Sequence, residues 1–419
     1  MILAPKPHTA RTTNAFHPRR PAPRGRGAPA LAAFAAILLR AGTPLVAQPA
    51  PTLTIASPAD AGMSAAVLQA GVELYREAVR QGDLVGAVLL VARDGKVVLH
   101  EAIGLRHREA NLPMEKNTMF RMASNTKPVV ATAVAMLVER GKLRFEDPVR
   151  KYMPSFDNYR SGFINIHHLL THTSGLRINT LFLEPYTQPS PANPDAPNLR
   201  TEAAKFGEVG AEVLPGTSYS YSNAGYNTLG ALIEIVSGKP LDVFMREEIY
   251  EPLGMSDSYH LEVDEKMDGK LHRMGAVYYR RTNGQWTAGW EPGDPPQVPF
   301  VRASGGMIST AWDYAIFLQT FLNEGAYGNV RLLKPETVRL MTSRHVATSP
   351  GRPGWYGYGW MIDEEGIYSH SGSDGTFAWV DPARRIIGLV FTQTPRGRNP
   401  RARFVELVKQ AVLEPAPQT

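Results

Sequence analysis

Hydrophobic and polar positions along the chain predict strands near both ends. Residues 64–81 carry apolar side chains mostly on one side and begin with Ser64 as N-cap, so we expect a helix there. Two apolar runs, 84–92 and 96–103, flank Asp94-Gly95, which predicts a β-hairpin. Further strands are predicted near the C-terminus, over 358–362, 366–370, 376–380 and 386–392. A closing helix is predicted after them, over 400–413.

The middle of the chain is predicted to be mainly helical. Helical patterns cover 124–140, 225–236, 241–250, 310–323 and 334–343. This distribution predicts one α+β domain, in which strands from both chain ends share a sheet and a mainly helical region (about 140–345) is inserted between them.

Two segments fit no simple pattern. Segment 177–215 contains six prolines, too many for regular structure, and we expect it to overhang the active-site cleft as a structured lid or a disordered stretch. Segment 271–300 is expected to contain a hairpin around Asn283-Gly284.

Composition indicates a folded globular protein. Of the 419 residues, 43% are apolar and 20% are charged, which excludes a disordered chain. The absence of cysteine excludes disulfide scaffolds, thiol nucleophiles and cysteine-ligated zinc.

The net charge of +6 comes from the first 47 residues, which hold seven basic and no acidic residues. Subtracting these seven from 45 leaves 38 basic against 39 acidic residues over 48–419, so we expect no nucleic-acid partner. The basic start and the apolar run 28–39 are typical of a secretory signal, and that run is too short to span a bilayer. We therefore expect a leader over 1–47, a hydrolase domain over 48–419, and an exported protein (periplasmic or secreted) without stable membrane insertion. A twin-arginine signal at Arg19-Arg20 and a disordered cytoplasmic tail remain alternatives.

Ser124 and Lys127 are the first candidates for chemistry. The Gly-x-Ser-x-Gly elbow of α/β-hydrolases is absent from the sequence. Ser124 and Lys127 open the predicted helix 124–140 three residues apart, so their side chains can meet near the positive helix end. A neighbouring lysine is one way to activate a hydroxyl nucleophile. Alone, the pair is more typical of an N-cap serine and a solvated lysine than of a catalytic pair.

Two more motifs follow in order, Tyr221-Ser222-Asn223 before a predicted helix and His370-Ser371-Gly372 at the end of a predicted strand. Together, Ser-x-x-Lys, Tyr-x-Asn and (Lys/His)-x-Gly resemble the signature of the serine β-lactamase and penicillin-binding superfamily. The likeness is greatest to class C β-lactamases and family VIII carboxylesterases and covers about 64–415, including segments 169–176 and 303–310. It implies a β-lactamase/transpeptidase-like fold with an antiparallel sheet flanked by helices.

The resemblance implies a role for each motif residue. Ser124 would be the nucleophile that forms an acyl-enzyme. Lys127 and Tyr221 together would form the base that removes the Ser124 proton, and the sequence leaves open which of the two carries a proton in the resting enzyme. Asn223 would bind the Lys127 side or a substrate amide, with a purely structural role as the alternative. The backbone N–H groups of Ser124 and Ser373, beside Gly372, would form the oxyanion hole.

His370 departs from the lysine that β-lactamases and peptidases of the superfamily usually carry there. Histidine is mostly neutral above its usual pKa of about 6.5, so a substrate carboxylate would be held less strongly. This favours an ester or another uncharged acyl substrate.

Other candidates are set aside. His167, His168 and His172 lack the acidic residue of a zinc-protease motif, so we expect no metal and interpret them as supporting the active-site wall. Tyr327-Gly328-Asn329 is interpreted as a turn.

The sequence thus predicts an exported serine hydrolase, most simply a carboxylesterase, acting on a small ester or amide without a cofactor. A β-lactamase, a D-amino-acid peptidase, a transacylase and a non-catalytic penicillin-binding or cell-wall-binding module remain alternatives. Nothing in the sequence indicates an oligomeric state.

Overall fold

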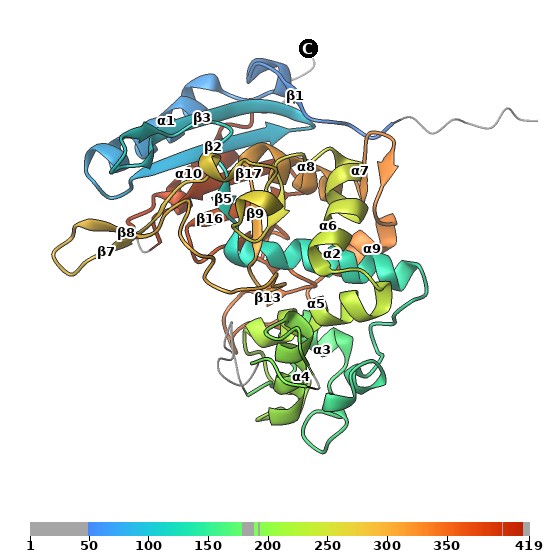
Figure 1. Cartoon of the computed structure of the whole chain (residues 1–419). Helices are drawn as coiled ribbons and strands as arrows, with labels where there is room; N and C mark the ends of the chain where they lie inside the picture. Colours follow the sequence, from blue (N-terminus) through green and yellow to red (C-terminus); the bar gives the residue numbers. More distant parts are fainter. Residues whose placement is uncertain (1–48, 178–187, 192, 396, 414–419) are drawn as a thin grey trace, which may run out of the picture. The chain divides into compact units, whose positions relative to one another are not determined.

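A ten-stranded sheet joins the two ends of the described chain (Figure 1). The computed structural model describes residues 49–177, 188–191, 193–395 and 397–413, which belong to one unit. The strand order is β1-β3-β2-β17-β16-β15-β14-β13-β12, with β4 paired to β3; every pairing is antiparallel except β1 with β3. The strands of this sheet are β1 Thr54–Ile55, β2 Gly86–Arg93, β3 Lys96–His107, β4 Leu112–Pro113, β12 Val346–Ala347, β13 Trp355–Tyr356, β14 Met361–Ile362, β15 Tyr368–Ser371, β16 Thr376–Asp381 and β17 Ile386–Thr392. The predicted α+β sheet built from both chain ends is confirmed.

The centre of this sheet is buried on both faces. Along β2, side chains alternate between two cores, as the period of a strand requires. Leu89 and Val91 pack with α1 (Ala65–Arg80) and α10 (Arg401–Gln410), whereas Val88 and Leu90 belong to the core that holds α2 (Thr126–Glu139) and α8 (Ala311–Leu322). The helix α2, which carries Lys127, is therefore fixed against the sheet.

Most predicted boundaries agree with the structure, and one strand is shorter than expected. The helix over 64–81 and the 84–103 hairpin form as predicted, and β17 coincides with 386–392. The predicted strand 358–362 shrinks to Met361–Ile362 because Gly359 takes a left-handed φ of 85° and makes the turn between β13 and β14.

Shorter helices fill the inserted region. They are α3 Ile166–Leu170, α4 Leu199–Val209, α5 Asn223–Ser237, α6 Leu241–Met245, α7 Glu251–Leu253 and α9 Pro335–Met341. The predicted helix 241–250 divides into α6 and a π-helical stretch, Arg246–Tyr250.

The expectation that 177–215 is too proline-rich for regular structure is wrong for its second half. The stretch 199–209 contains no proline, and the Asn198 side chain accepts a hydrogen bond from the Thr201 N–H, which caps α4. The prolines lie before and after the helix. Residues 178–187 and 192 lie outside the described part of the chain, so the expected lid is not described there.

Small sheets interrupt the helical insertion. One is a three-stranded sheet in the order β5-β9-β6, and the others are the hairpins β7–β8 and β10–β11. Their strands are β5 Phe120–Arg121, β6 Tyr259–His260, β7 Val277–Arg280, β8 Trp286–Trp290, β9 Met307–Ser309, β10 Ala326–Tyr327 and β11 Val330–Arg331. The hairpin expected around Asn283-Gly284 is β7–β8. The Tyr327 motif lies in the β10–β11 turn, where its hydroxyl accepts a hydrogen bond from the Leu53 N–H at 3.0 Å.

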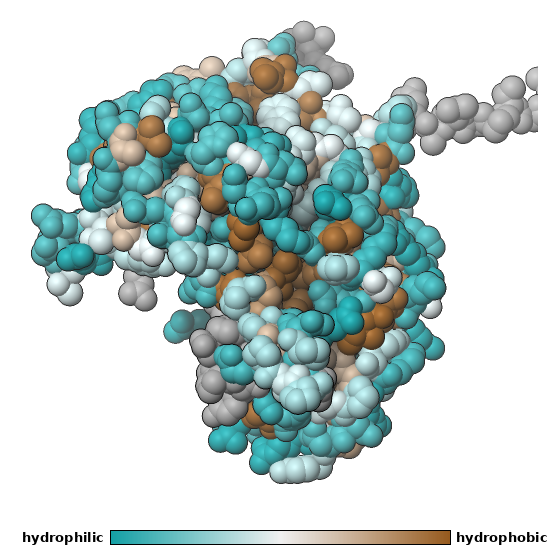
Figure 2. All heavy atoms as spheres, in the orientation of Figure 1, coloured by the Kyte–Doolittle hydropathy of each residue, from teal (hydrophilic) through white to brown (hydrophobic). Residues whose placement is uncertain are grey.

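The predicted leader 1–47 lies outside the described residues. Among the residues that are described, no helix is long and apolar enough to cross a membrane. Figure 2 shows apolar side chains gathered in the middle of one face, over the region of β5, β9 and α2, with hydrophilic residues around them.

Candidate active site

Ser124 lies in a strained turn immediately before α2. It belongs to a 3-10 turn, Ala123–Asn125, and not to the first turn of the α-helix as the sequence predicts. Ala123 has a left-handed φ of 45°, which is uncommon for a residue with a side chain. The turn is fixed from β16, because the Thr376 hydroxyl donates to the Met122 carbonyl at 3.1 Å and accepts from the Asn125 amide at 2.9 Å. The fold thus presents the Ser124 hydroxyl at a rigid bend, a recurrent feature of functional sites.

Lys127 is fully buried beneath Ser124. Its Nζ atom lies 3.1 Å from the Ser124 Oγ, 2.9 Å from the Asn223 Oδ1 and 2.7 Å from the Ser304 carbonyl oxygen. Burial, and next the charge of Arg302, hold the pKa of Lys127 well below its usual range. A neutral amine has two N–H donors and one lone pair. The two donors match Asn223 and Ser304, which directs the lone pair to the Ser124 hydroxyl.

Tyr221 completes this cluster from the segment before α5. The Lys127 Nζ lies 4.7 Å from the centre of the Tyr221 ring, and Tyr221 lines the same cavity as Ser124. Burial raises the pKa of Tyr221 above its usual value of 10.0, and a hydrogen bond with Ser124 only partly opposes this. The phenol therefore stays protonated at neutral pH. The sequence places Ser124, Lys127 and Tyr221 in one site, and the structure brings all three together.

His172 holds the backbone on both sides of Tyr221. Its carbonyl accepts from the Ser220 N–H at 2.8 Å, and its Nδ1 accepts from the Ser222 N–H at 3.0 Å. The centres of the His172 and Tyr221 rings are 4.3 Å apart. His172 is thus a support of the active-site wall, as expected, but it lies beyond the end of α3 with a φ of 59° and shares no helix face with His168.

Gly372 and Ser373 lie against the nucleophile turn. A Cβ atom on Gly372 would lie 2.3 Å from the Thr376 Oγ1 and 2.4 Å from the Met122 carbonyl oxygen, so only glycine permits this approach. Ser373 lines the cavity beside Ser124, and within the described residues no hydrogen bond uses the Ser373 backbone N–H. This N–H is free to donate to an oxygen in the cavity.

His370 lies behind the cavity wall. Its Nδ1 donates to the Ser371 carbonyl at 3.0 Å, so its Nε2 accepts from the Tyr356 hydroxyl at 3.1 Å. Burial, with a smaller effect of the Lys127 charge, lowers the pKa of His370 from 6.5 to about 3. His370 is neutral and internally hydrogen-bonded, so it offers no cation to a substrate. The neutral state agrees with the expectation for histidine, whereas the expected substrate-binding role does not, because both ring nitrogens bond within the protein and His370 does not line the cavity.

The cavity above Ser124 measures about 510 Å³. Of the predicted site residues, Ser124, Tyr221, Asn223 and Ser373 line it. The lining also includes residues that motif analysis did not single out: Arg121, Tyr279, Gln297, Arg302, Ser304, Gly305 and Asp374.

Arg121, in the wall of this cavity, is held by two carboxylates and one amide. Its Nε lies 3.1 Å from both the Glu262 and the Asp374 carboxylates, and its Nη2 donates to Gln297 at 3.0 Å. Among the newly found lining residues, Ser304 and Gly305 fall in the segment 303–310 that carries the family resemblance, and the others belong to none of the three motifs. The residues come together through folding alone.

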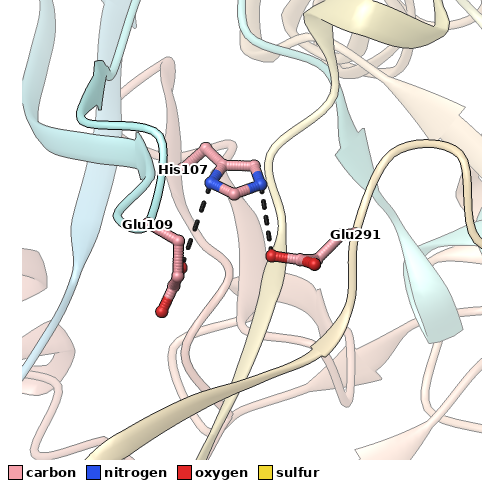
Figure 3. A group of neighbouring side chains, drawn as sticks. All are labelled: His107, Glu109 and Glu291. Carbon is pink, nitrogen blue, oxygen red and sulfur yellow. Dashed lines mark ion pairs between the residues drawn. The ribbon is translucent and has the colours of Figure 1, made fainter.

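The described residues contain one group of histidine and carboxylate side chains with metal-like spacing: His107, Glu109 and Glu291 (Figure 3). The His107 Nε2 faces Glu291 at 3.2 Å, whereas its Nδ1 lies 3.9 Å from Glu109 and accepts from the Ala110 N–H. The two carboxylates meet opposite edges of the imidazole, and one possible ligand atom from each of the three side chains lies within 4.8 Å of the others. Through these polar contacts the group links the end of β3 to the residue that follows β8.

Comparison with known proteins accounts for this arrangement of serine, lysine and tyrosine. Residues 66–411 match the Beta-lactamase family. The chain belongs to that family. It is a serine hydrolase of the β-lactamase and penicillin-binding superfamily, and the β-lactamase/transpeptidase-like fold is confirmed.

Relatives within this superfamily carry different names. The chain is 26% identical over 397 residues to a putative D-alanyl-D-alanine carboxypeptidase of Escherichia coli K12, covering 82% of this chain and 86% of that one. It is 38% identical over 207 residues to esterase EstB of Burkholderia gladioli, covering 47% of this chain and 52% of EstB. The octameric penicillin-binding protein homologue from Pyrococcus abyssi superposes with a TM-score of 0.66 at 25% identity, covering 84% of this chain and 77% of the homologue.

Proposed function

We propose that this family member is a carboxylesterase that cleaves small esters through an acyl-enzyme on Ser124. The observation that carries the choice of ester is the state of His370. A neutral, buried imidazole stands where β-lactamases use a lysine cation to hold the carboxylate of the β-lactam. Without that cation, β-lactam binding loses its electrostatic anchor, whereas the acylation machinery is complete.

Acylation follows from the contacts of Lys127. Its lone pair takes the Ser124 proton as Oγ attacks the ester carbonyl carbon, and the ammonium that forms keeps three acceptors within 3.1 Å. The new oxyanion receives hydrogen bonds from the backbone N–H groups of Ser124 and Ser373, each worth about 10²–10³ in rate.

Collapse of this intermediate breaks the bond to the alcohol oxygen. Tyr221, still a phenol, donates its proton to that oxygen and regains one from the Lys127 ammonium. Water then attacks the acyl-enzyme by the same proton transfers, and the carboxylic acid product leaves with Ser124 restored.

The similarity to EstB supports the esterase assignment, and the similarity to the putative D-alanyl-D-alanine carboxypeptidase keeps peptidase activity as the second candidate. Export through the leader 1–47 belongs to this proposal and rests on sequence alone. Fusion of residues 1–47 to a reporter enzyme, followed by cell fractionation, tests it.

Labelling tests the enzymatic proposal. The wild type and Ser124→Ala are treated with a fluorophosphonate probe and with fluorescent penicillin, then assayed on p-nitrophenyl esters and nitrocefin. We expect labelling and ester turnover in the wild type, loss of both in Ser124→Ala, and little nitrocefin hydrolysis. Ser256→Ala is the matched control, because Ser256 is exposed and outside the lining of the cavity. Rapid hydrolysis of nitrocefin would favour a β-lactamase. Absence of any label that depends on Ser124 would favour a non-catalytic binding module.

A further inference from the structure

Arg302 is a buried cation in the wall of the active-site cavity. Only 7% of its surface is exposed, yet it lines the same cavity as Ser124 and Tyr221. Two residues later, the Ser304 carbonyl accepts the hydrogen bond of Lys127. The charge of Arg302 acts on Lys127, where it helps to lower the pKa. Arg302 is therefore near the reacting atoms.

The Arg302 guanidinium lacks the partners that a buried arginine normally has. A guanidinium carries five N–H donors and remains charged in proteins. Among the residues described by the structure, no hydrogen bond or ion pair uses the Arg302 side chain, whereas Arg121 in the same wall contacts Glu262, Asp374 and Gln297. None of its nitrogens is an enclosed, unpartnered atom, so the donors open to the cavity.

The surrounding carboxylates do not neutralise this cation. Glu262, Asp374 and Glu202 attract Arg302 electrostatically, but burial outweighs them and lowers the pKa of Arg302 from its usual value. Arg121 adds repulsion. A buried charge without hydrogen bonds is costly, and an anionic ligand would provide both the charge and the acceptors.

We propose that Arg302 binds a carboxylate group of the substrate, so that the enzyme prefers esters of carboxylate-bearing molecules. This inference rests on the proposed ester hydrolysis at Ser124 and names its substrate class. A planar carboxylate fits the guanidinium fork through two parallel hydrogen bonds. A single negative charge also suits a site that has Asp374 in its wall and Glu262 close to Arg302, whereas a phosphate dianion would meet their repulsion.

This proposal changes the expectation of an uncharged substrate. That expectation considered only the strand position of His370, which is neutral. Arg302 supplies a permanent cation from the segment before β9 instead. A substrate carboxylate would thus be recognised at another part of the cavity than the position that β-lactamases use.

Matched ester pairs test the proposal. Mono-p-nitrophenyl adipate and p-nitrophenyl hexanoate share a six-carbon acyl chain and differ in one terminal carboxylate; p-nitrophenyl butyrate and its 3-carboxy-4-nitrophenyl analogue place the carboxylate on the alcohol side. The readout is the ratio of kcat/KM within each pair, because an effect of Arg302 on Lys127 alters both members alike. We expect the wild type to prefer the carboxylate ester at least about tenfold in one pair.

Variants connect this preference to Arg302. Arg302→Met should abolish it, Arg302→Lys should retain part of it, and the exposed control Arg144→Met should leave it as in the wild type. Absence of preference in both wild-type pairs, or an unchanged ratio in a folded Arg302→Met, would overturn the inference while ester hydrolysis stands.

Binding separates this inference from the proposed function. Calorimetry measures the affinity of Ser124→Ala for monomethyl adipate and for methyl hexanoate, with and without Arg302→Met. Tighter binding of the adipate that depends on Arg302 supports the carboxylate site even if no ester is turned over. Equal affinities would contradict it.

Discussion

The Nζ atom of Lys127 lies 2.7 Å from the carbonyl oxygen of Ser304, closer than it lies to Ser124. A carbonyl can only accept, so one N–H of the amine is committed to it, and the Asn223 Oδ1 takes a second. The one remaining position of a neutral amine faces the nucleophile. The Ser304 backbone therefore orients the base, although its side chain is not needed for this.

Replacing Lys127 by arginine separates proton acceptance from charge. Arginine places a permanent cation at this position and cannot accept a proton at neutral pH. We expect Lys127→Arg to slow acylation by about 10²–10⁴, as for loss of a general base. The burst of p-nitrophenol measures acylation, and near wild-type acylation would show that charge alone suffices.

Gly372→Ala tests the close contact with the nucleophile turn. The added Cβ would lie 2.4 Å from the Met122 carbonyl, a backbone atom that cannot move without displacing the Ser124 turn. We expect a loss of kcat/KM of at least about 10² because the Ser373 N–H no longer meets the oxyanion. Gly275→Ala is the control, since its Cβ would have its nearest contact at 3.5 Å and should leave the rate unchanged.

His172→Phe tests the support of Tyr221. Phenylalanine fills the ring space but leaves the Ser222 N–H without its acceptor, a loss of about 1–3 kcal/mol in stability. We also expect kcat to fall about tenfold with little change in KM, because the phenol is less well positioned. The assay is done well below the unfolding temperature. A stability loss with unchanged kcat would reduce His172 to a purely structural residue.

His370 makes stability depend on pH. Its pKa is about 3 in the folded protein and 6.5 as an ordinary value, so between these values the unfolded chain binds more protons. The free energy of unfolding should fall as the pH falls from about 6.5 towards 3, with His370 contributing at most about 1.4 kcal/mol per pH unit. Urea unfolding at a series of pH values measures this change. The free energy of unfolding should fall less steeply with decreasing pH in His370→Gln than in the control His272→Gln, in which an exposed histidine is replaced.

Hydrophobic periodicity and helix-capping residues predict those helices and strands whose conformation is determined by neighbouring residues. The strand 386–392 and the helix beginning after Ser64 have strong periodicity and a clear cap, and both form as predicted. Helix α4 was missed because the proline content of its surroundings obscures a short stretch that Asn198 caps. The strand expected at 358–362 fails because a single left-handed glycine is invisible to hydrophobic pattern.

The active site likewise combines residues that the sequence predicts and residues that only the structure reveals. Ser124, Lys127 and Tyr221 lie in short motifs and could be placed together from the sequence. Arg302 and Arg121 belong to no motif, and only tertiary packing brings them into the cavity wall. The sequence predicts a mostly neutral His370, but the burial that lowers its pKa arises from packing between separate strands, which no spacing rule reveals.

The pairing of β2 with β17 has a consequence for synthesis of the enzyme. These neighbours at the centre of the sheet are separated by almost the whole described chain, and the Thr376 that anchors the nucleophile turn lies on the adjoining strand. A ribosome must therefore translate beyond β17, which ends at Thr392, before the reactive hydroxyl acquires its final surroundings. Such long-range closure is slow, so nascent chains remain without activity until the last strands arrive.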